Sequence, residues 1–107
     1  MLKLIYITCS DKNEASAIGK TLVKNRLCAC CNIINEISSI YWWDGELEED
    51  SESVLIAKTL NENVDKVISK VKEIHSYDNP CILTIPVLKT TKEYEDYINN
   101  EVKLNGE

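Results

Sequence analysis

Residues 39–52, SIYWWDGELEEDSE, decide the fold of this chain. The pair Asp44-Gly45 predicts a type I′ hairpin turn, because both central positions of that turn take positive φ angles that these residue types tolerate. Residues 28–43 are rich in Cys, Ile, Tyr and Trp and contain neither Pro nor Gly, as is typical of a long strand. The chain returns through residues 46–52 into the apolar run 54–57, so we expect a long hairpin whose second arm is central in its sheet.

A strand and a helix are expected before this hairpin. Residues 2–8 form an almost continuous apolar run, which predicts a strand covered on both faces. Asp11 and Glu14 have the spacing of a capping box, which opens a helix over residues 11–26.

A helix, a strand and a second helix are expected after the hairpin. Asn61 is expected to cap a helix that ends near His75, because a proline follows shortly afterwards. Residues 81–88 predict a strand, and Pro86 indicates that it lies at a sheet edge. Thr90 begins the last helix.

This order of elements predicts a single domain over residues 1–107 in the α+β class. Its pattern is a ferredoxin-like βαββαβ sandwich with a long hairpin and an extra C-terminal helix. The helices of such a sandwich cover one face of a four-stranded antiparallel sheet. The other face stays bare unless another chain covers it.

Two adjacent tryptophans, Trp42 and Trp43, are expected to point to opposite sides of the hairpin. One can enter the core, while the other lies on a ribbon that extends past the small domain. Because a buried indole removes on the order of 200 Å² from water, a subunit interface is favoured over partial surface exposure.

The composition narrows the classes of partner and the compartment. The net charge is -6, and residues 28–57 contain no Lys or Arg, so a nucleic-acid partner is not expected. No apolar run approaches the ~20 residues of a membrane span, and residues 1–10 lack the basic head of a signal peptide. Five cysteines, an odd number, favour free thiols in a reducing compartment, so we expect a cytoplasmic protein.

Residues with soft metal-binding side chains lie at the predicted ends of a strand and a helix. Cys9 ends the first strand near a helix N-terminus, which favours a thiolate. With His75, the single histidine, and Cys81, it could offer ligands suited to Cu(I). Ordinary packing of Cys9 and a structural role for His75 at a helix end are the alternatives.

The spacing of Cys28 and Cys31 is that of a C-x-x-C pair. On a regular strand these two side chains face opposite ways, so a shared metal is not expected, whereas Cys28 and Cys30 share a face as structural residues. The pair also follows a helix, although a redox motif would need a helix N-terminus to activate its thiol. With one His and no Gly-rich phosphate cradle, no catalytic arrangement is indicated, so we do not expect an enzyme.

Two runs of the sequence resemble patterns of the CutA family. Residues 26–34, RLCACCNII, resemble R-L-A-A-C-x-N-I-I, and residues 39–45, SIYWWDG, resemble S-I-Y-x-W-[ED]-G. Further similarity lies in residues 48–52, 56–59, 75–80 and 94–98. The resemblance implies a homotrimer similar in architecture to PII signalling proteins, a link to tolerance of copper and other divalent cations, and no enzymatic activity.

The resemblance also implies a copper site at Cys9 and His75. Ile74 replaces the second histidine of the family, and Cys81 replaces a family acid. Residues at an interface or cleft between subunits are then Tyr41, Trp42, Trp43, Lys58 and Tyr77. An alternative function is a PII-like signalling or scaffold protein, which would bind a small ligand or a partner protein in these clefts.

Overall fold

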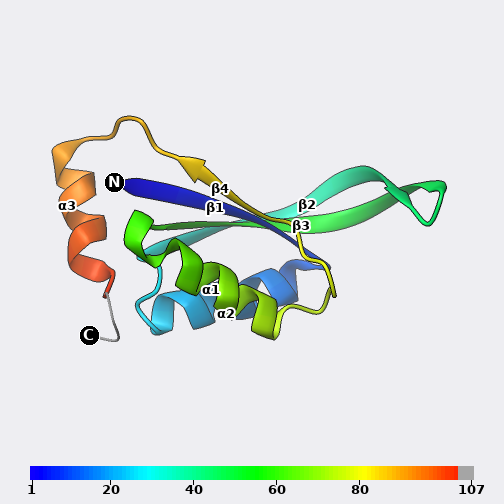
Figure 1. The fold of residues 1–107 in the computed structure, drawn as a ribbon, viewed down its shortest axis with the longest axis horizontal. Helices are drawn as coiled ribbons and strands as arrows, with labels where there is room; N and C mark the ends of the chain where they lie inside the picture. Colours follow the sequence, from blue (N-terminus) through cyan, green and yellow to red (C-terminus); the bar gives the residue numbers. More distant parts are fainter. Residues whose placement is uncertain (104–107) are drawn as a thin grey trace.

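The computed structural model describes residues 1–103, which form four strands and three α-helices (Figure 1). In chain order the elements are β1 (Leu2–Cys9), α1 (Lys12–Lys24), β2 (Cys30–Trp43), β3 (Glu46–Leu60), the 3₁₀ turn η1 (Asn61–Asn63), α2 (Val64–Ile74), β4 (Ile82–Pro86) and α3 (Lys92–Glu101). The sheet has the order β2-β3-β1-β4, and each neighbouring pair is antiparallel. The βαββαβ order, the central position of β3, the edge position of β4 and the extra C-terminal helix are confirmed.

The hairpin β2-β3 extends far beyond the helices (Figure 1). Trp43 pairs with Glu46 across a turn in which Asp44 has φ 51° and Gly45 has φ 80°, as the type I′ prediction requires. β2 carries a bulge between Ile34 and Ile37. The ribbon gives the chain its elongated shape, with principal extents of 45 × 27 × 21 Å.

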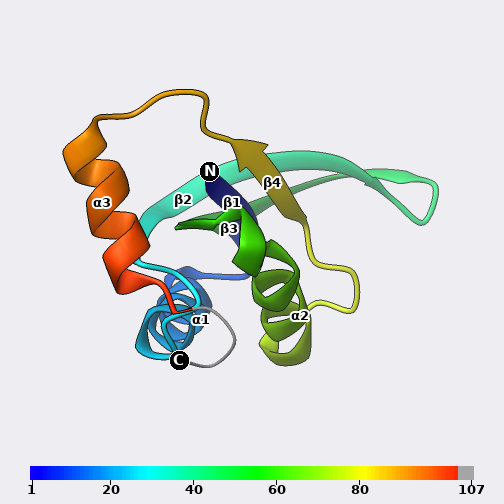
Figure 2. The same cartoon turned by 60° about the vertical axis from the view of Figure 1, so that its left-hand side comes forward.

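One face of the sheet is covered by α1 and α2, and this layer holds the main core (Figure 1). Ile5 and Ile7 of β1 pack there with Leu22 of α1 and Val67 of α2. A second cluster lies where β1 begins, and α3 closes it with Ile98 (Figure 2).

The expectation that β1 is covered on both faces is wrong within the chain. Its inward side chains, such as Ile5, are buried, but Leu4, Tyr6 and Thr8 on the other face stay half-exposed. The neighbouring β4 residues Leu83 and Ile85 are also exposed, so much of this apolar face is uncovered in the single chain.

Of the three predicted helix starts, one is confirmed and two differ from the structure. Asp11 caps α1, since its side chain accepts a hydrogen bond from Glu14 N at 2.8 Å. Asn61 does not cap α2, because the chain first makes η1 and then enters the helix at Asn63 without a side-chain cap. The last helix begins one residue later than predicted, with the Thr91 hydroxyl accepting from the main-chain N–H of the third helical residue at 3.2 Å.

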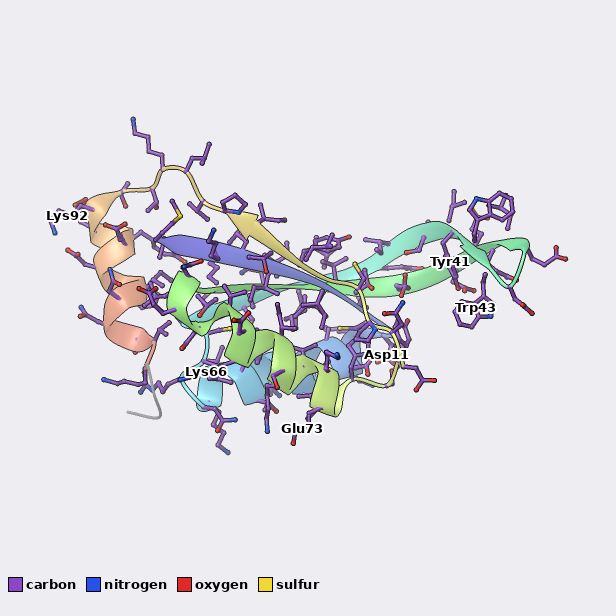
Figure 3. All side chains as sticks on the ribbon, in the orientation of Figure 1. Asp11, Tyr41, Trp43, Lys66, Glu73 and Lys92 are labelled. Atoms are coloured by element: carbon purple, nitrogen blue, oxygen red, sulfur yellow. The ribbon has the colours of Figure 1, made fainter. Side chains whose placement is uncertain are left out.

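Neither tryptophan enters the core, which corrects that part of the prediction. Trp42 is 74% exposed and Trp43 is 67% exposed. They lie near the tip of the ribbon, where neither α1 nor α2 covers the hairpin (Figure 3 labels Trp43).

The relation predicted for the clustered cysteines is also wrong. β2 begins only at Cys30, so Cys28 lies in the connection from α1 and not on the strand. Cys28 belongs to the main core, and Cys31 packs against the same cluster. Cys30 packs against the second cluster instead. The turn after α1 is the physical reason, because strand alternation does not govern a residue that precedes the strand.

Candidate metal centre

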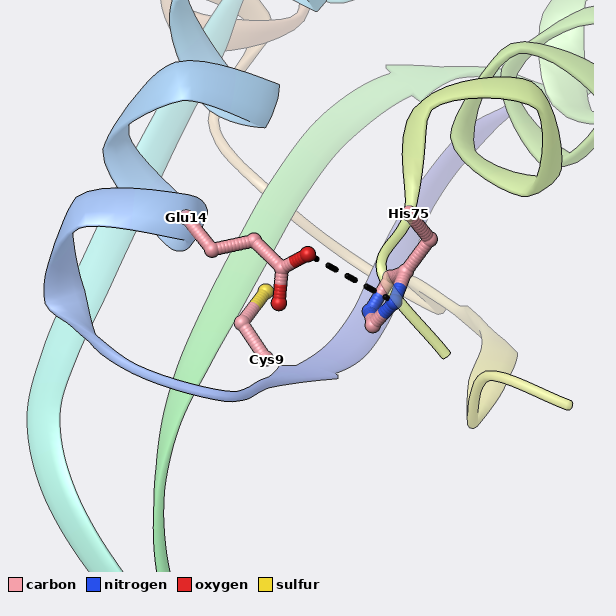
Figure 4. A group of neighbouring side chains, drawn as sticks. All are labelled: Cys9, Glu14 and His75. Atoms are coloured by element: carbon pink, nitrogen blue, oxygen red, sulfur yellow. Dashed lines mark ion pairs between the residues drawn. The ribbon is translucent and has the colours of Figure 1, made fainter. Parts of the chain in front are cut away.

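Three potential metal ligands meet at the end of β1 (Figure 4). Cys9 is the last residue of β1, Glu14 lies in the first turn of α1, and His75 caps the C-terminus of α2. One sulfur, oxygen or nitrogen donor atom from each residue lies within 4.8 Å of the other two. The βαββαβ topology creates this meeting, because it brings both helix ends to the same end of the central strand.

Hydrogen bonds fix the tautomer of His75, whose side chain is fully buried. The main-chain N–H of Tyr77 donates to Nδ1 at 3.0 Å, so Nδ1 is unprotonated. Nε2 therefore carries the proton and donates to the carbonyl oxygen of Thr8 at 2.8 Å. This arrangement leaves Nδ1 on the side of Glu14, whose Oε2 is 3.8 Å away.

The carboxylate of Glu14 is held ionised. Burial opposes its charge, but hydrogen bonds from Ser10 and Ser76 outweigh burial and lower its pKa to about 2. Ser10 donates to Oε1 from its main-chain N at 2.9 Å and from its hydroxyl at 3.0 Å, and Ser76 N donates to Oε2 at 2.8 Å. The residue thus joins the start of α1 to the segment after α2.

Cys9 is buried and protonated, which corrects the expectation of a thiolate. Burial, together with the smaller effects of the carboxylates of Glu14, Glu52 and Asp11, raises the pKa of its thiol to about 12. These effects outweigh the attraction of a helix N-terminus for negative charge.

Tyr77 lies beside the three-residue cluster. Its ring lies 4.8 Å from the His75 ring, centroid to centroid, and its hydroxyl donates to Glu52 Oε2 at 2.8 Å. Burial and then the bond to Glu52 raise the pKa of this phenol.

The sequence-predicted ligands are only partly brought together. Cys9 and His75 meet, whereas the thiol of Cys81 is not a member of the donor group, and Cys81 contributes its main-chain carbonyl to Thr8 N at 3.3 Å. Glu14 was not predicted as a ligand, because its place after Asp11 was interpreted as capping alone. The signal that could have found it is a carboxylate one helical turn after the end of the strand that carries Cys9.

The residues predicted for an inter-subunit cleft lie at three separate places in the chain. Lys58 donates to the Tyr94 hydroxyl at 3.2 Å, near the end of β3. Tyr77 contacts Glu52, six residues back along that strand, or about 20 Å at the usual rise. Tyr41, Trp42 and Trp43 lie on the ribbon, where the Tyr41 hydroxyl donates to an acid of β3 (Figure 3).

A thiol, a carboxylate and an imidazole form a mixed S, O, N donor set. This set suits borderline divalent cations, and its thiol and imidazole also suit Cu(I). The donor chemistry and the spacing therefore fit a copper-type cation.

Comparison with known proteins identifies the family to which the chain is similar. Its residues 3–101 match the family described as CutA1 divalent ion tolerance protein. It is 41% identical over 103 residues to the divalent-cation tolerance protein CutA of Archaeoglobus fulgidus, covering 96% of this chain and all of that one. It is 38% identical to the Thermus thermophilus protein of the same name, covering 92% of this chain and 95% of that one.

Solved structures agree with this match. The Archaeoglobus fulgidus structure, named a periplasmic divalent cation tolerance protein, has a TM-score of 0.93 at 41% identity over 96% of this chain and 100% of that chain. The Ehrlichia chaffeensis CutA1 structure has a TM-score of 0.92 at 33% identity, with 96% of each chain covered.

Fold and site together define a small α+β protein with a four-stranded antiparallel sheet and a mixed-donor cluster at one end. The chain belongs to the CutA1 divalent ion tolerance protein family. The names of the relatives above describe tolerance to divalent cations, and none is the name of an enzyme. Among residues 1–103, no helix is both long and apolar enough to cross a membrane.

Proposed function

We propose that this protein is a non-enzymatic, trimeric divalent-cation tolerance protein that binds a copper-type cation through Cys9, Glu14 and His75. The observation that carries the proposal is the mutual approach of three different donor atoms within 4.8 Å. Glu14 is already ionised, so one ligand is ready at neutral pH.

The environment of His75 supports coordination through Nδ1. Metal-bound histidines usually donate their other ring N–H to a carbonyl or carboxylate, which orients the ring. Nε2 already donates to Thr8 O, and Nδ1 faces Glu14. Binding then needs two local changes: the N–H of Tyr77 moves off Nδ1, and the Cys9 thiol releases its proton.

A homotrimer of PII-like architecture is the second part of the proposal. Apolar side chains are exposed on the ribbon and on the bare sheet face, namely Ile40, Trp42, Trp43, Leu47, Leu83 and Ile85. Contiguous exposed apolar surface marks an interaction site, and a second and third copy of the chain are the partners we propose. The net charge of -6 argues against nucleic acid or an anionic membrane as a further partner.

A second candidate function is suggested by a cavity of about 190 Å³ near α3. Lys3, Lys58 and Lys89 line it together with the ring of Tyr94 and an apolar floor. A small organic anion fits this lining, which would make the protein a PII-like ligand-binding regulator or scaffold. Equilibrium dialysis with a panel of carboxylates, comparing Lys58→Met with the unaltered chain, tests this alternative.

A cytoplasmic location remains part of the proposal. Its support is that all five cysteines are unpaired in the structure. Cell fractionation with the native protein tests it, and recovery in a periplasmic fraction would contradict it.

Calorimetric titration of the reduced protein with Cu(II) and Co(II), and with Cu(I) held by a competing chelator, tests the metal site. We expect Cys9→Ser and Glu14→Gln to weaken binding by at least about tenfold each, as loss of a ligand should. Cys81→Ser is the matched control and should leave binding unchanged.

A spectroscopic readout separates the site from general effects on folding. Co(II) bound to Cys9 should give a sulfur-to-cobalt charge-transfer band that Cys9→Ser removes and Cys81→Ser keeps. Full affinity and an unaltered band in Cys9→Ser would show that the cluster is not the site. Sedimentation equilibrium at micromolar concentration tests the trimer, and a stable monomer would contradict it.

A further inference from the structure

Cys28 and Cys31 lie in or against the same core cluster, on either side of the connection between α1 and β2. Each thiol also shifts the pKa of the other, so the two side chains are neighbours. Cys28 is only 1% exposed, whereas Cys31 is partly exposed. Cys31 is therefore the more accessible of the two residues.

The end of α1 places Cys28. Leu27 N donates to Leu22 O at 3.0 Å and Arg26 N donates to Val23 O at 3.0 Å, which are the two bonds of a Schellman motif. Arg26 takes the left-handed conformation of that motif, with φ 61°. Cys28 N then donates to the same Leu22 carbonyl at 3.2 Å, so the turn delivers Cys28 to the helix-covered side of the sheet.

Gly19 of α1 lies directly against the side chain of Cys31. A Cβ atom at this position of α1 would lie 3.5 Å from Cys31 Cβ and 3.7 Å from Cys31 Sγ. The Sγ atom lies 3.9 Å from the carbonyl oxygen of Gly19, a weak hydrogen bond of the thiol. Cys31 is therefore packed against α1.

The two thiols differ in acidity. Interaction with the Cys28 thiol lowers the pKa of Cys31, and the charge of Lys58 lowers it further, although burial opposes both. The same interaction and burial raise the pKa of Cys28. The more accessible sulfur is thus also the better nucleophile, because the thiolate is the reactive form.

We propose that Cys28 and Cys31 form a redox-active dithiol, with Cys31 as the attacking sulfur and Cys28 as the resolving sulfur. The oxidant is a small disulfide such as glutathione disulfide. This site is distinct from the Cys9 cluster, and it does not depend on the proposed metal function.

The reaction is two thiol–disulfide exchanges. The Cys31 thiolate attacks one sulfur of glutathione disulfide, whose S–S bond breaks and releases one glutathione thiolate. Cys28 then loses its proton and attacks the Cys31 sulfur, which releases the second glutathione. Both cysteines are oxidised, one glutathione disulfide is reduced to two thiols, and the two protein protons end on those thiols.

The final S–S bond needs the sulfurs to approach to about 2.05 Å. The adjustment falls on residues 27–29, which belong to no helix or strand because they lie between α1 and β2. Cys30 cannot replace either partner, because its side chain packs against the other cluster, where Lys58 and Tyr94 lie.

The test exposes the reduced, folded protein to increasing ratios of oxidised to reduced glutathione, followed by acid quenching, alkylation and peptide mass mapping. We expect the unaltered chain to lose two hydrogens within residues 27–58, with Cys30 alkylated and Cys28 and Cys31 protected. Cys28→Ala should stop at a stable glutathione adduct on Cys31. Cys31→Ser should form no intramolecular disulfide.

Cys30→Ser is the matched control and should oxidise like the unaltered chain. Circular dichroism confirms that each variant is folded before oxidation. A lasting glutathione adduct on Cys31 in the unaltered chain, or a disulfide that includes Cys30, would overturn the proposal. Equal alkylation of all three thiols at the most oxidising ratio would also overturn it.

Discussion

His75 Nε2 and the carbonyl oxygen of Thr8 lie 2.8 Å apart, so the residue that caps the C-terminus of α2 is tied to the end of β1. The bond joins two segments that are 67 positions apart in the sequence. It holds the imidazole so that its other nitrogen faces Glu14. The ring is therefore oriented before any cation arrives, which lowers the cost of organising the site.

Replacing Cys9 with Ala should make the protein relatively more resistant to alkaline pH. The folded state raises the pKa of this thiol from 9.0 to about 12, so between these values the folded chain keeps a proton that the unfolded chain has lost. Stability from this group is complete below pH 9 and falls as pH rises through that window, by at most about 1.4 kcal/mol per pH unit. Urea unfolding from pH 8 to 11 measures the difference between the two chains.

The comparison with Cys9→Ala removes the effect of other groups, including Tyr77, whose pKa is also raised. Cys81→Ala provides a control thiol outside the cluster. Parallel pH curves for Cys9→Ala and the unaltered chain would show that the Cys9 thiol is not perturbed.

Replacing Glu14 with Gln should destabilise the fold by about 1–3 kcal/mol at pH 7, because the charged acceptor of three hydrogen bonds is lost. The pKa of Glu14 is lowered from 4.5 to about 2, so its contribution is present above pH 4.5 and is lost as pH falls toward 2. The gap between the two chains should narrow over that range in acid unfolding experiments. A constant gap would contradict the assigned charge.

Replacing Arg26 with Gly should stabilise the protein by up to about 1 kcal/mol. Arg26 has φ 61°, a conformation that costs a non-glycine residue roughly 1–2 kcal/mol. Its ion pair with Glu101, at 2.6 Å, joins two exposed side chains and contributes at most about 1 kcal/mol. Thermal unfolding measures the balance, and Arg26→Ala, which loses the pair and keeps the strain, should be destabilised.

Replacing Trp42 with Ser should weaken self-association while leaving the secondary structure intact. The indole is 74% exposed within the chain, so the fold of one subunit loses little. Sedimentation equilibrium should show dissociation at a higher protein concentration than for the unaltered chain. Val23→Ser, a partly exposed apolar position on α1, is the control, and an equal effect of both variants would argue against a ribbon interface.

The periodicity of apolar residues and the Asp44-Gly45 turn predicted the element order and the hairpin. Those signals are local, and the structure follows them. The failures arise where a local pattern competes with packing. Asn61 has the chemistry of a cap, yet the chain makes a 3₁₀ turn there, and the buried Asn63 side chain bonds to Leu27 O and Lys103 O instead.

Only part of the candidate site could be predicted from the sequence, for a similar reason. Cys9 and His75 were expected together because the resemblance pairs them. Glu14 was assigned to capping, although its carboxylate reaches Ser10 and Ser76. The protonated state of Cys9 depends on burial and on three acids from different segments. This combined effect cannot be inferred from the spacing of residues in the sequence.

The bulge in β2 has a consequence for how this ribbon can change over generations. Ile34 pairs with Val54 and Ile37 pairs with Glu52, so β2 advances by three residues where β3 advances by two. Because directly paired residues of antiparallel strands lie on the same face, the bulge takes up this one surplus residue and keeps the outer ribbon in phase with β3. Deleting a single codon at position 35 or 36 would remove the bulge and leave each indole on its present side, with the tip sequence left untouched. Because a bulge bends its strand and increases the local twist, the direction of the outer ribbon can thus be changed in one genetic step.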